Sequence, residues 1–465
     1  MTGLPNVVWV TIESTRADHT SVDGYERDTT PNLRRIADSA DGRSFDACFA
    51  HGVWTLPSSA SILTGTVPTR HDAGMESEAI PERMRTVPEL FRELGYRTAG
   101  LSTNFHASGA TDLDRGFDRF GWLSRDTLFD VVGARTLAKY LAGIRRHSAG
   151  FTTDTSKHST GYLVTDVLKR WLRDLSDDQP FFLYAHYGDP HHEYYPPLPY
   201  HDRFLDDIPV DRAREIVADH HDRINELIAT GCELDEEAWT ALKAMYDAEI
   251  AYTDELIGEL FDRVRERWPD TVFVITADHG ELFGEQGMLA HKVVTDDAVS
   301  RVPLVVHGLP ALTEHSGELV QHVDVVRTLL ADLGHRSTQL QGYDLREETR
   351  PFAVTQRGAK RYRKNVDAFT EIEPAFDADR YHDGQLHALR TESFKYLSSD
   401  DGDALVRPPD EETDVSGKYP DVAERLRERL ETWLETTGRP FTTDRREREY
   451  SGAVKRQMED LGYLE

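Results

Sequence analysis

Side chains that could bind a metal ion follow three apolar runs of the sequence. VVWVTIE ends in a carboxylate, VFVITADHG contains an Asp–His pair, and FFLYAHYG is followed by an Asp-Pro-His-His segment. In that order, the residues are Glu13, Asp278 and His279, and Asp189, His191 and His192. A carboxylate at a strand end is often only the cap of the next helix. Carboxylate oxygens and imidazole nitrogens on one predicted face, however, together suit a divalent cation.

A fourth segment, WTLPSSASILTG at 54–65, has the features of a helix start. We expect Thr55 to lie just before the helix N-terminus, where backbone N–H groups and the helix dipole favour an anion. A hydroxyl beside a metal ion can attack a phosphorus or sulfur ester, because the metal lowers its pKa. On this segment alone, a plain helix cap is the simpler interpretation of Thr55.

The elements that must position these groups alternate between strand and helix. The near-continuous apolar run at 5–13 predicts a strand buried on both faces of a parallel sheet. Similar runs lie at 98–103, 181–187, 271–277 and 302–307, and a long helical pattern covers roughly 237–268. This alternation predicts an α/β/α sandwich with a mostly parallel sheet, in which ligands gather at the carboxyl ends of the strands.

The sequence changes in character after residue 345. Short segments separated by turn and charged residues predict a small antiparallel sheet, closed by a helix at about 420–436. We therefore expect a catalytic domain at 1–345, a C-terminal α+β subdomain at 346–440 and a peripheral charged tail at 441–465. The acidic stretch at 200–235 is interpreted as an insertion or lid.

Composition limits the partners and the environment. The chain has 54 Lys and Arg residues against 83 Asp and Glu, a net charge of −29, which disfavours nucleic acid and anionic membranes as partners. High acidity with scarce lysine resembles a halophilic protein. Two cysteines, Cys48 and Cys232, exclude a disulfide scaffold. We find neither a signal-peptide pattern nor an apolar run long enough to span a membrane, so we expect a cytoplasmic location.

Six segments in register resemble the sulfatase family of the alkaline phosphatase superfamily. They are VVWVTIESTRADHTSVDGYERDTTPNL, WTLPSSASILTG, YGDPHHEYYPP, YDAEIAYTDELIGEL, ADHGELFGEQGMLAHK followed by SRVPLVV, and HALRTESFKYL. By this resemblance, the fold is alkaline-phosphatase-like, Glu13, Asp278 and His279 bind one divalent ion, and Thr55 occupies the nucleophile position and also contacts the metal. A His ligand favours Mn²⁺ or Zn²⁺, with Ca²⁺ or Mg²⁺ as the alternatives.

The resemblance also assigns groups that handle the substrate. His191, His291 and Lys292 would hold its charged oxygens or protonate the leaving group, and the resemblance leaves open which of His291 and Lys292 points into the site. For Arg16 and His19, in the opening motif, we expect a structural salt bridge or a helix contact.

The sequence departs from the usual sulfatase pattern at the nucleophile. Typical sulfatases carry C-x-P-x-R, whose Cys becomes formylglycine, whereas Thr55 and Ser59 stand at the Cys and Arg positions here. Ile12 and Glu13 stand where a double Asp is common. The set Glu, Thr, Asp and His is more similar to the phosphoethanolamine and phosphoglycerol transferases of the superfamily. Those enzymes have membrane helices, and we find none here.

These observations predict a metal-dependent hydrolase that cleaves a phosphate or sulfate ester through a covalent Thr55 intermediate. Its substrate would be a small anionic ester or glycan; the oligomeric state stays open. One alternative is a phospho-group transferase. Another is a two-metal phosphodiesterase, with Asp189, His191 and His291 as further ligands. A third is an inactive relative that binds an anionic glycan.

Overall fold

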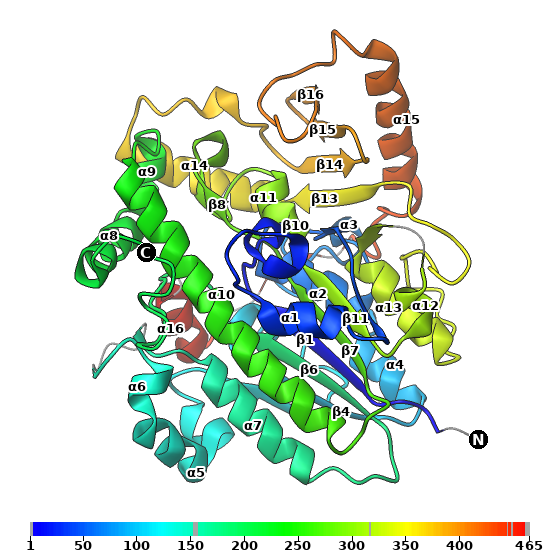
Figure 1. The fold of residues 1–465 in the computed structure, drawn as a ribbon. Helices are drawn as coiled ribbons and strands as arrows, with labels where there is room; N and C mark the ends of the chain where they lie inside the picture. The colour runs from blue at the N-terminus through cyan, green and yellow to red at the C-terminus, as the bar shows by residue number, and fades with distance from the viewer. Residues whose placement is uncertain (1–2, 152–156, 316–317, 444, 448–449, 461–465) are drawn as a thin grey trace.

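The centre of the computed structural model is a seven-stranded sheet (Figure 1). The structure describes residues 3–151, 157–315, 318–443, 445–447 and 450–460. In chain order, the strands are β1 (Val7–Ile12), β2 (Gly42–Ser44), β4 (Arg97–Ser102), β5 (Arg119–Trp122), β6 (Phe181–Tyr187), β7 (Val272–Ala277) and β11 (Leu304–His307). Their order across the sheet is β2-β11-β7-β1-β6-β4-β5. Among these strands, β11 pairs antiparallel with both β7 and β2, and the other four pairs are parallel, which confirms the predicted α/β class with a mostly parallel sheet.

The central strand β1 contributes to two hydrophobic cores because successive side chains point to opposite faces. Val7 and Trp9 belong to one core, and Val8, Val10 and Ile12 belong to the other. The first core includes α2 (Thr55–Thr64), α4 (Val87–Glu93) and α13 (His322–Asp332), and the second includes α1 (Pro31–Ala37), α7 (Gly161–Arg173) and α10 (Glu236–Arg265). Helices therefore cover both faces of the sheet, and β1 is buried along its whole length.

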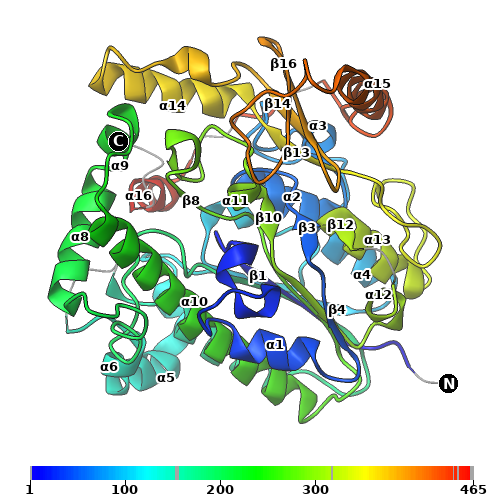
Figure 2. The ribbon, with the colours of Figure 1, turned by 45° about the horizontal axis from the view of Figure 1, so that its top comes forward.

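The C-terminal segment forms a second sheet, which is antiparallel. Its strands are β13 (Ala353–Arg357), β14 (Leu386–Arg390), β15 (Lys395–Ser399) and β16 (Gly402–Val406), with α14 (Ala359–Ile372) between the first two. Helix α15 (Pro420–Thr436) packs on this sheet through Leu426, Leu430 and Trp433. The sheet and its closing helix are as predicted, and Figure 2 shows both beside α14 at the upper edge of the molecule. The domain boundary at 345 stays a prediction.

Two other segments surround the main domain. The stretch at 200–235 contains α8 (Val210–Asp222) and α9 (Ile224–Ala229), which pack against α10 and α14 respectively. The tail contains α16 (Gly452–Asp460), where Val454 is buried against Phe105. Within the described ranges, every helix is too short or too polar to cross a membrane.

Candidate active site

Adjacent strands bring together three of the predicted metal ligands. β1 pairs with β7 in a register that places Ile12 beside Ala277, so Glu13 and Asp278 leave the sheet side by side. One ligand atom from each of Glu13, Asp278 and His279 lies within 4.8 Å of the others, and all three residues are buried. The carboxyl ends of the two strands therefore form a compact set of two carboxylates and an imidazole.

Thr55 completes this group from the N-terminus of α2. It is the first residue of this ten-residue helix rather than the residue before it, and it is fully buried. Its hydroxyl donates a hydrogen bond to Oε1 of Glu13 at 3.0 Å and lies 3.4 Å from Nε2 of His279. The helix ends at Gly65, whose φ of +66° suits a glycine C-cap. We call Glu13, Thr55, Asp278 and His279 the strand-end cluster.

The strand-end cluster has the features of a cation site. Oδ1 of Asp278 accepts hydrogen bonds from the backbone N–H groups of Ser14 and His279, whereas Oδ2 has no hydrogen-bond partner in the described part of the chain. Burial and the charge of Asp278 raise the pKa of Glu13 well above its usual value. Two buried carboxylates with an unsatisfied oxygen are stable together when a cation neutralises them. The residues therefore fit the single divalent ion that the sequence predicts.

The ring orientation of His279 fits the same purpose. Its Nδ1 lies 2.8 Å from the carbonyl oxygen of Gly280, which suits an Nδ1–H donor. This tautomer leaves Nε2, the atom that faces Thr55, with a lone pair for a metal ion. Burial lowers the pKa of His279, which keeps the ring in its neutral form.

Two polar residues in contact with the strand-end cluster escaped the sequence analysis. Asn104 follows β4, and its amide Nδ2 donates to Oε1 of Glu13 and lies 3.4 Å from Oγ1 of Thr55. His186 lies within β6, with Nε2 3.7 Å from Oδ2 of Asp278. Both left a signal: Asn104 follows a predicted strand end, and His186 is an ionisable residue inside an otherwise apolar run.

The structure brings two of the three predicted substrate-handling residues to the strand-end cluster. Nε2 of His191 lies 3.9 Å from Oε1 of Glu13, and the ring of His291 lies 4.5 Å from that of His279, between centroids. Burial lowers the pKa of His191 to about 4 and that of His291 well below its usual value. Lys292 instead donates to Oδ1 of Asn225 in α9 at 2.7 Å. Of the adjacent pair, His291 is therefore the residue beside the cluster.

Other candidates have structural partners. Oδ2 of Asp189 accepts hydrogen bonds from Ser159 Oγ at 2.7 Å and from the backbone N–H of Gly161 at 3.0 Å, at the start of α7. Asp189 is in neither of the two groups of potential metal ligands found among the described residues. Arg16 forms ion pairs with Asp18 and Glu285, and His19 contacts Asp247, in agreement with the structural role expected for that motif.

Arg361 on α14 brings a positive charge to the site from the C-terminal segment. Its guanidinium lies 4.3 Å from the ring centroid of Trp54, the residue before Thr55. Its charge opposes protonation of His279 and His291, and so contributes to their lowered pKa values. In the sequence, the basic run AKRYRK in an otherwise acidic chain could have indicated Arg361.

A cavity of about 820 Å³ adjoins the strand-end cluster. Glu13, His191 and His192 line one part of it. Other parts of its wall combine apolar side chains with both basic and acidic ones; they include Leu128, Leu137, Tyr140, Arg125, Lys157, Asp126, Glu193, Asp222 and Glu249. The cavity gives the site room for a substrate larger than the reacting group alone.

Comparisons with known proteins agree with this fold. The family model "Sulfatase" matches residues 5–335. The chain is 25% identical over 386 residues to the multifunctional alkaline phosphatase superfamily protein PehA of Trinickia caryophylli, across 71% of this chain and 74% of PehA. It is 23% identical over 462 residues to arylsulfatase K of Bos taurus, across 92% and 81% of the two chains. The solved phosphonate monoester hydrolase of Agrobacterium radiobacter superposes with a TM-score of 0.70 at 20% identity, across 93% of this chain and 96% of that one.

Fold and site together define an enzyme class, the hydrolases of the alkaline phosphatase superfamily. Within that superfamily, the chain belongs to the sulfatase family, whose model covers more than half of it.

Proposed function

We propose that this protein is a metal-dependent hydrolase that cleaves a phosphate or sulfate ester through a covalent bond to Thr55. The observation that carries the proposal is the position of the Thr55 hydroxyl. It is buried at a helix N-terminus and donates to Glu13 within the strand-end cluster. An ester oxygen that enters there would contact the positive end of the helix dipole and the charge of any bound cation.

Glu13, Asp278 and His279, with the Thr55 hydroxyl, would hold one divalent ion. When bound, such an ion lowers the pKa of a coordinated hydroxyl and stabilises negative charge on the reacting ester. Mn²⁺ and Zn²⁺ suit this mixed oxygen and nitrogen set better than Ca²⁺ or Mg²⁺, which prefer oxygen ligands.

The protein side chains then account for the two steps. The Thr55 hydroxyl gives its proton to Oε1 of Glu13, its hydrogen-bond acceptor, and Oγ1 forms a bond to phosphorus while the bond to the alcohol oxygen breaks. That alcohol oxygen takes a proton from His191 or His291. Both imidazoles are neutral before substrate binds, but an adjacent anion raises the pKa of an imidazole. Water next attacks phosphorus and gives a proton to the imidazole, while Oγ1 of Thr55 leaves phosphorus and takes back its proton from Glu13. One hard step is thereby divided into two easier ones.

The missing cysteine favours phosphorus esters over sulfate esters. A formylglycine hydrate has a second hydroxyl that helps to expel sulfate by elimination, whereas a threonine ester has none. Cys48 lies in β3 (Ala47–Phe49), away from the nucleophile position, and both cysteines are buried as free thiols. Burial raises both thiol pKa values, that of Cys232 to about 12, so neither is an activated nucleophile. The charge of Arg361, which lies beside Trp54, favours an anionic group at the strand-end cluster.

A hydrolysis screen tests this proposal. Aryl phosphate, phosphodiester, phosphonate and sulfate esters would be offered to the purified chain in high salt with Mn²⁺, Zn²⁺, Ca²⁺ or Mg²⁺. We expect metal-dependent release of the alcohol from at least one phosphorus ester, at a higher rate than from any sulfate ester. Faster cleavage of the sulfate esters would overturn the preference, and no cleavage of any ester would favour the inactive, glycan-binding alternative.

A further inference from the structure

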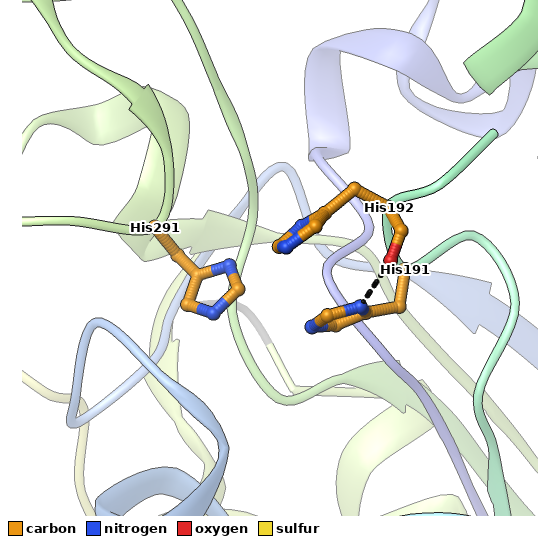
Figure 3. A group of neighbouring side chains, drawn as sticks. All are labelled: His191, His192 and His291. Carbon is orange, nitrogen blue, oxygen red and sulfur yellow. Dashed lines mark hydrogen bonds between the residues drawn. The ribbon is translucent and has the colours of Figure 1, made fainter. Parts of the chain in front are cut away.

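A second group of potential metal ligands lies beside the strand-end cluster. It consists of His191 and His192, from the loop after β6, and of His291, which follows β9 (Leu289–Ala290). We call these three residues the histidine cluster. Figure 3 shows the rings of His191 and His192 stacked, with the ring of His291 facing them. One ring nitrogen from each lies within 4.8 Å of the other two.

A buried carboxylate adds a fourth ligand to this group. Glu281 lies between β7 and β8 (Leu282–Phe283), with Oε1 3.5 Å from Nδ1 of His291 and Oε2 3.8 Å from Nδ1 of His192. In a tetrahedral zinc site, bonds of about 2.0–2.2 Å place neighbouring ligand atoms roughly 3.3–3.6 Å apart. The two measured distances are close to that value, so an ion could be bound with small side-chain movements.

The surroundings of Glu281 also point to a ligand. Its side chain is fully buried, and neither carboxylate oxygen makes a hydrogen bond of normal geometry in the part of the chain that the structure describes, although the Tyr194 hydroxyl lies close enough to favour its charged form. A buried carboxylate without partners is costly, and native proteins pair such groups with hydrogen-bond donors, cations or metal ions. His191 and His192 line the 820 Å³ cavity, which gives an ion a path to the group.

We propose that His191, His192, His291 and Glu281 bind a second divalent cation, with Zn²⁺ preferred. Three imidazole nitrogens and one carboxylate oxygen form a donor set that suits zinc and excludes a preference for Mg²⁺ or Ca²⁺. The set shares no residue with the strand-end cluster, although His191 lies 3.9 Å from Glu13. With both ions bound, the leaving-group oxygen would contact the second ion instead of the imidazole of His191 or His291.

This inference goes beyond the proposed function, which requires only the ion of the strand-end cluster. It also changes the ligand set of the two-metal alternative, because Asp189 is held by Ser159 and Gly161 at the start of α7. The competing role for the histidine cluster is direct contact with the oxygens of the substrate, with no ion present.

Metal stoichiometry separates these two roles. The full chain would be freed of metal with a chelator, dialysed against Zn²⁺ and analysed by elemental mass spectrometry. We expect two zinc equivalents per chain in the wild type and one in His192→Gln and in Glu281→Gln. His221→Gln is the matched control: this ring lies 5.8 Å from that of His192 and contacts Glu193, so this variant should keep two equivalents.

If Glu281→Gln does not fold, a variant of the strand-end cluster provides the test. Asp278→Asn removes a ligand of the strand-end cluster only, so it should still bind one equivalent of Zn²⁺ or of Co²⁺. The bound Co²⁺ should show the strong visible absorption of a tetrahedral site. A single equivalent in the wild type, unchanged by His192→Gln and lost in Asp278→Asn, would overturn the second site. That result would leave the proposed function intact, because the proposed function depends on the strand-end ion and on Thr55.

Discussion

The strand-end cluster and the histidine cluster are neighbours, but the chain positions them in different ways. Glu13 and Asp278 each follow a buried parallel strand, and the β1–β7 register fixes their separation. His191 and His192 come from a loop, and His291 follows a strand of only two residues. The first cluster is therefore positioned by backbone hydrogen bonds within the sheet, and the second by the packing of loops around the cavity.

This difference has a chemical consequence. A rigid set of ligands at strand ends suits the group that must hold the nucleophile in one geometry, because small displacements are costly in catalysis. Loop residues can differ between relatives while the scaffold stays the same, and so they suit the recognition of substrates. We expect damage to the strand-end cluster to affect every substrate, and damage to the histidine cluster to depend on the leaving group.

The largest expected effect comes from the metal ligands of the strand-end cluster. Asp278→Asn or His279→Ala should lose the ion of that cluster and reduce turnover by about 10³-fold or more, because charge stabilisation at the reacting ester is lost. Metal analysis and steady-state kinetics measure both effects, and an unchanged melting curve would show that the fold survives. Wild-type turnover and metal content in either variant would show that the site is misassigned.

A smaller effect is expected from the histidine cluster. His291→Ala should lower turnover by roughly 10²-fold, the lower end of what a proton-transfer group contributes. The adjacent Lys292→Ala is the matched control and should stay within a few-fold of the wild type, because Lys292 donates to Asn225. The comparison should be made with a good and a poor leaving group. Equal losses in the two variants would contradict the assignment of His291 as the residue that faces the site.

Asn104 tests the support around the strand-end cluster. Asn104→Ala removes the amide that donates to Glu13, so the affinity for the ion should fall by about 10- to 100-fold, as is typical when a group that orients a ligand is removed. Titration of metal-free protein with Mn²⁺ or Zn²⁺ measures this loss. Added metal should restore much of the activity, in contrast to Asp278→Asn; a failure to recover at saturating metal would assign Asn104 a direct role in the reaction.

The smallest effect concerns the surface rather than either cluster. Self-repulsion at a net charge of −29 should be screened as salt rises, since the Debye length falls from about 10 Å at 0.1 M to about 3 Å at 1 M. We expect the melting temperature to increase by a few degrees over that range, while metal affinity at the buried strand-end cluster changes little. Differential scanning calorimetry in NaCl or KCl measures the shift. A flat or falling melting temperature would contradict adaptation to high salt.

The contrast between the clusters also explains what could be predicted from the sequence. Apolar runs that end in Glu13 and Asp278 indicated the strands, because a strand buried on both faces is almost entirely apolar, and the polar residues at their ends were the candidate ligands. The pairing of β1 with β7 rather than with another strand was not predictable, since strand order depends on contacts far apart in the chain. Thr55 was identified through its helix start, and only its place within the first turn differs.

The rest of the site depends on tertiary packing. The sequence did not decide between His291 and Lys292, because a one-residue shift in an irregular loop reverses which side chain points inward. Glu281 was absent from the prediction, as it follows the Asp–His pair and has no periodicity of its own. Arg361 lies more than 300 residues after Trp54 and reaches the site only because α14 packs back against the main domain.

The central claim is that Thr55 forms the covalent intermediate, and a rapid-quench experiment tests it most directly. The enzyme would be mixed with the best phosphorus ester found in the screen, quenched in acid within milliseconds and examined by intact mass and peptide mapping. We predict one added phosphoryl group on the peptide that contains Thr55, with no label and no turnover in Thr55→Ala. Full turnover by Thr55→Ala, or a label on any other residue, would contradict the account.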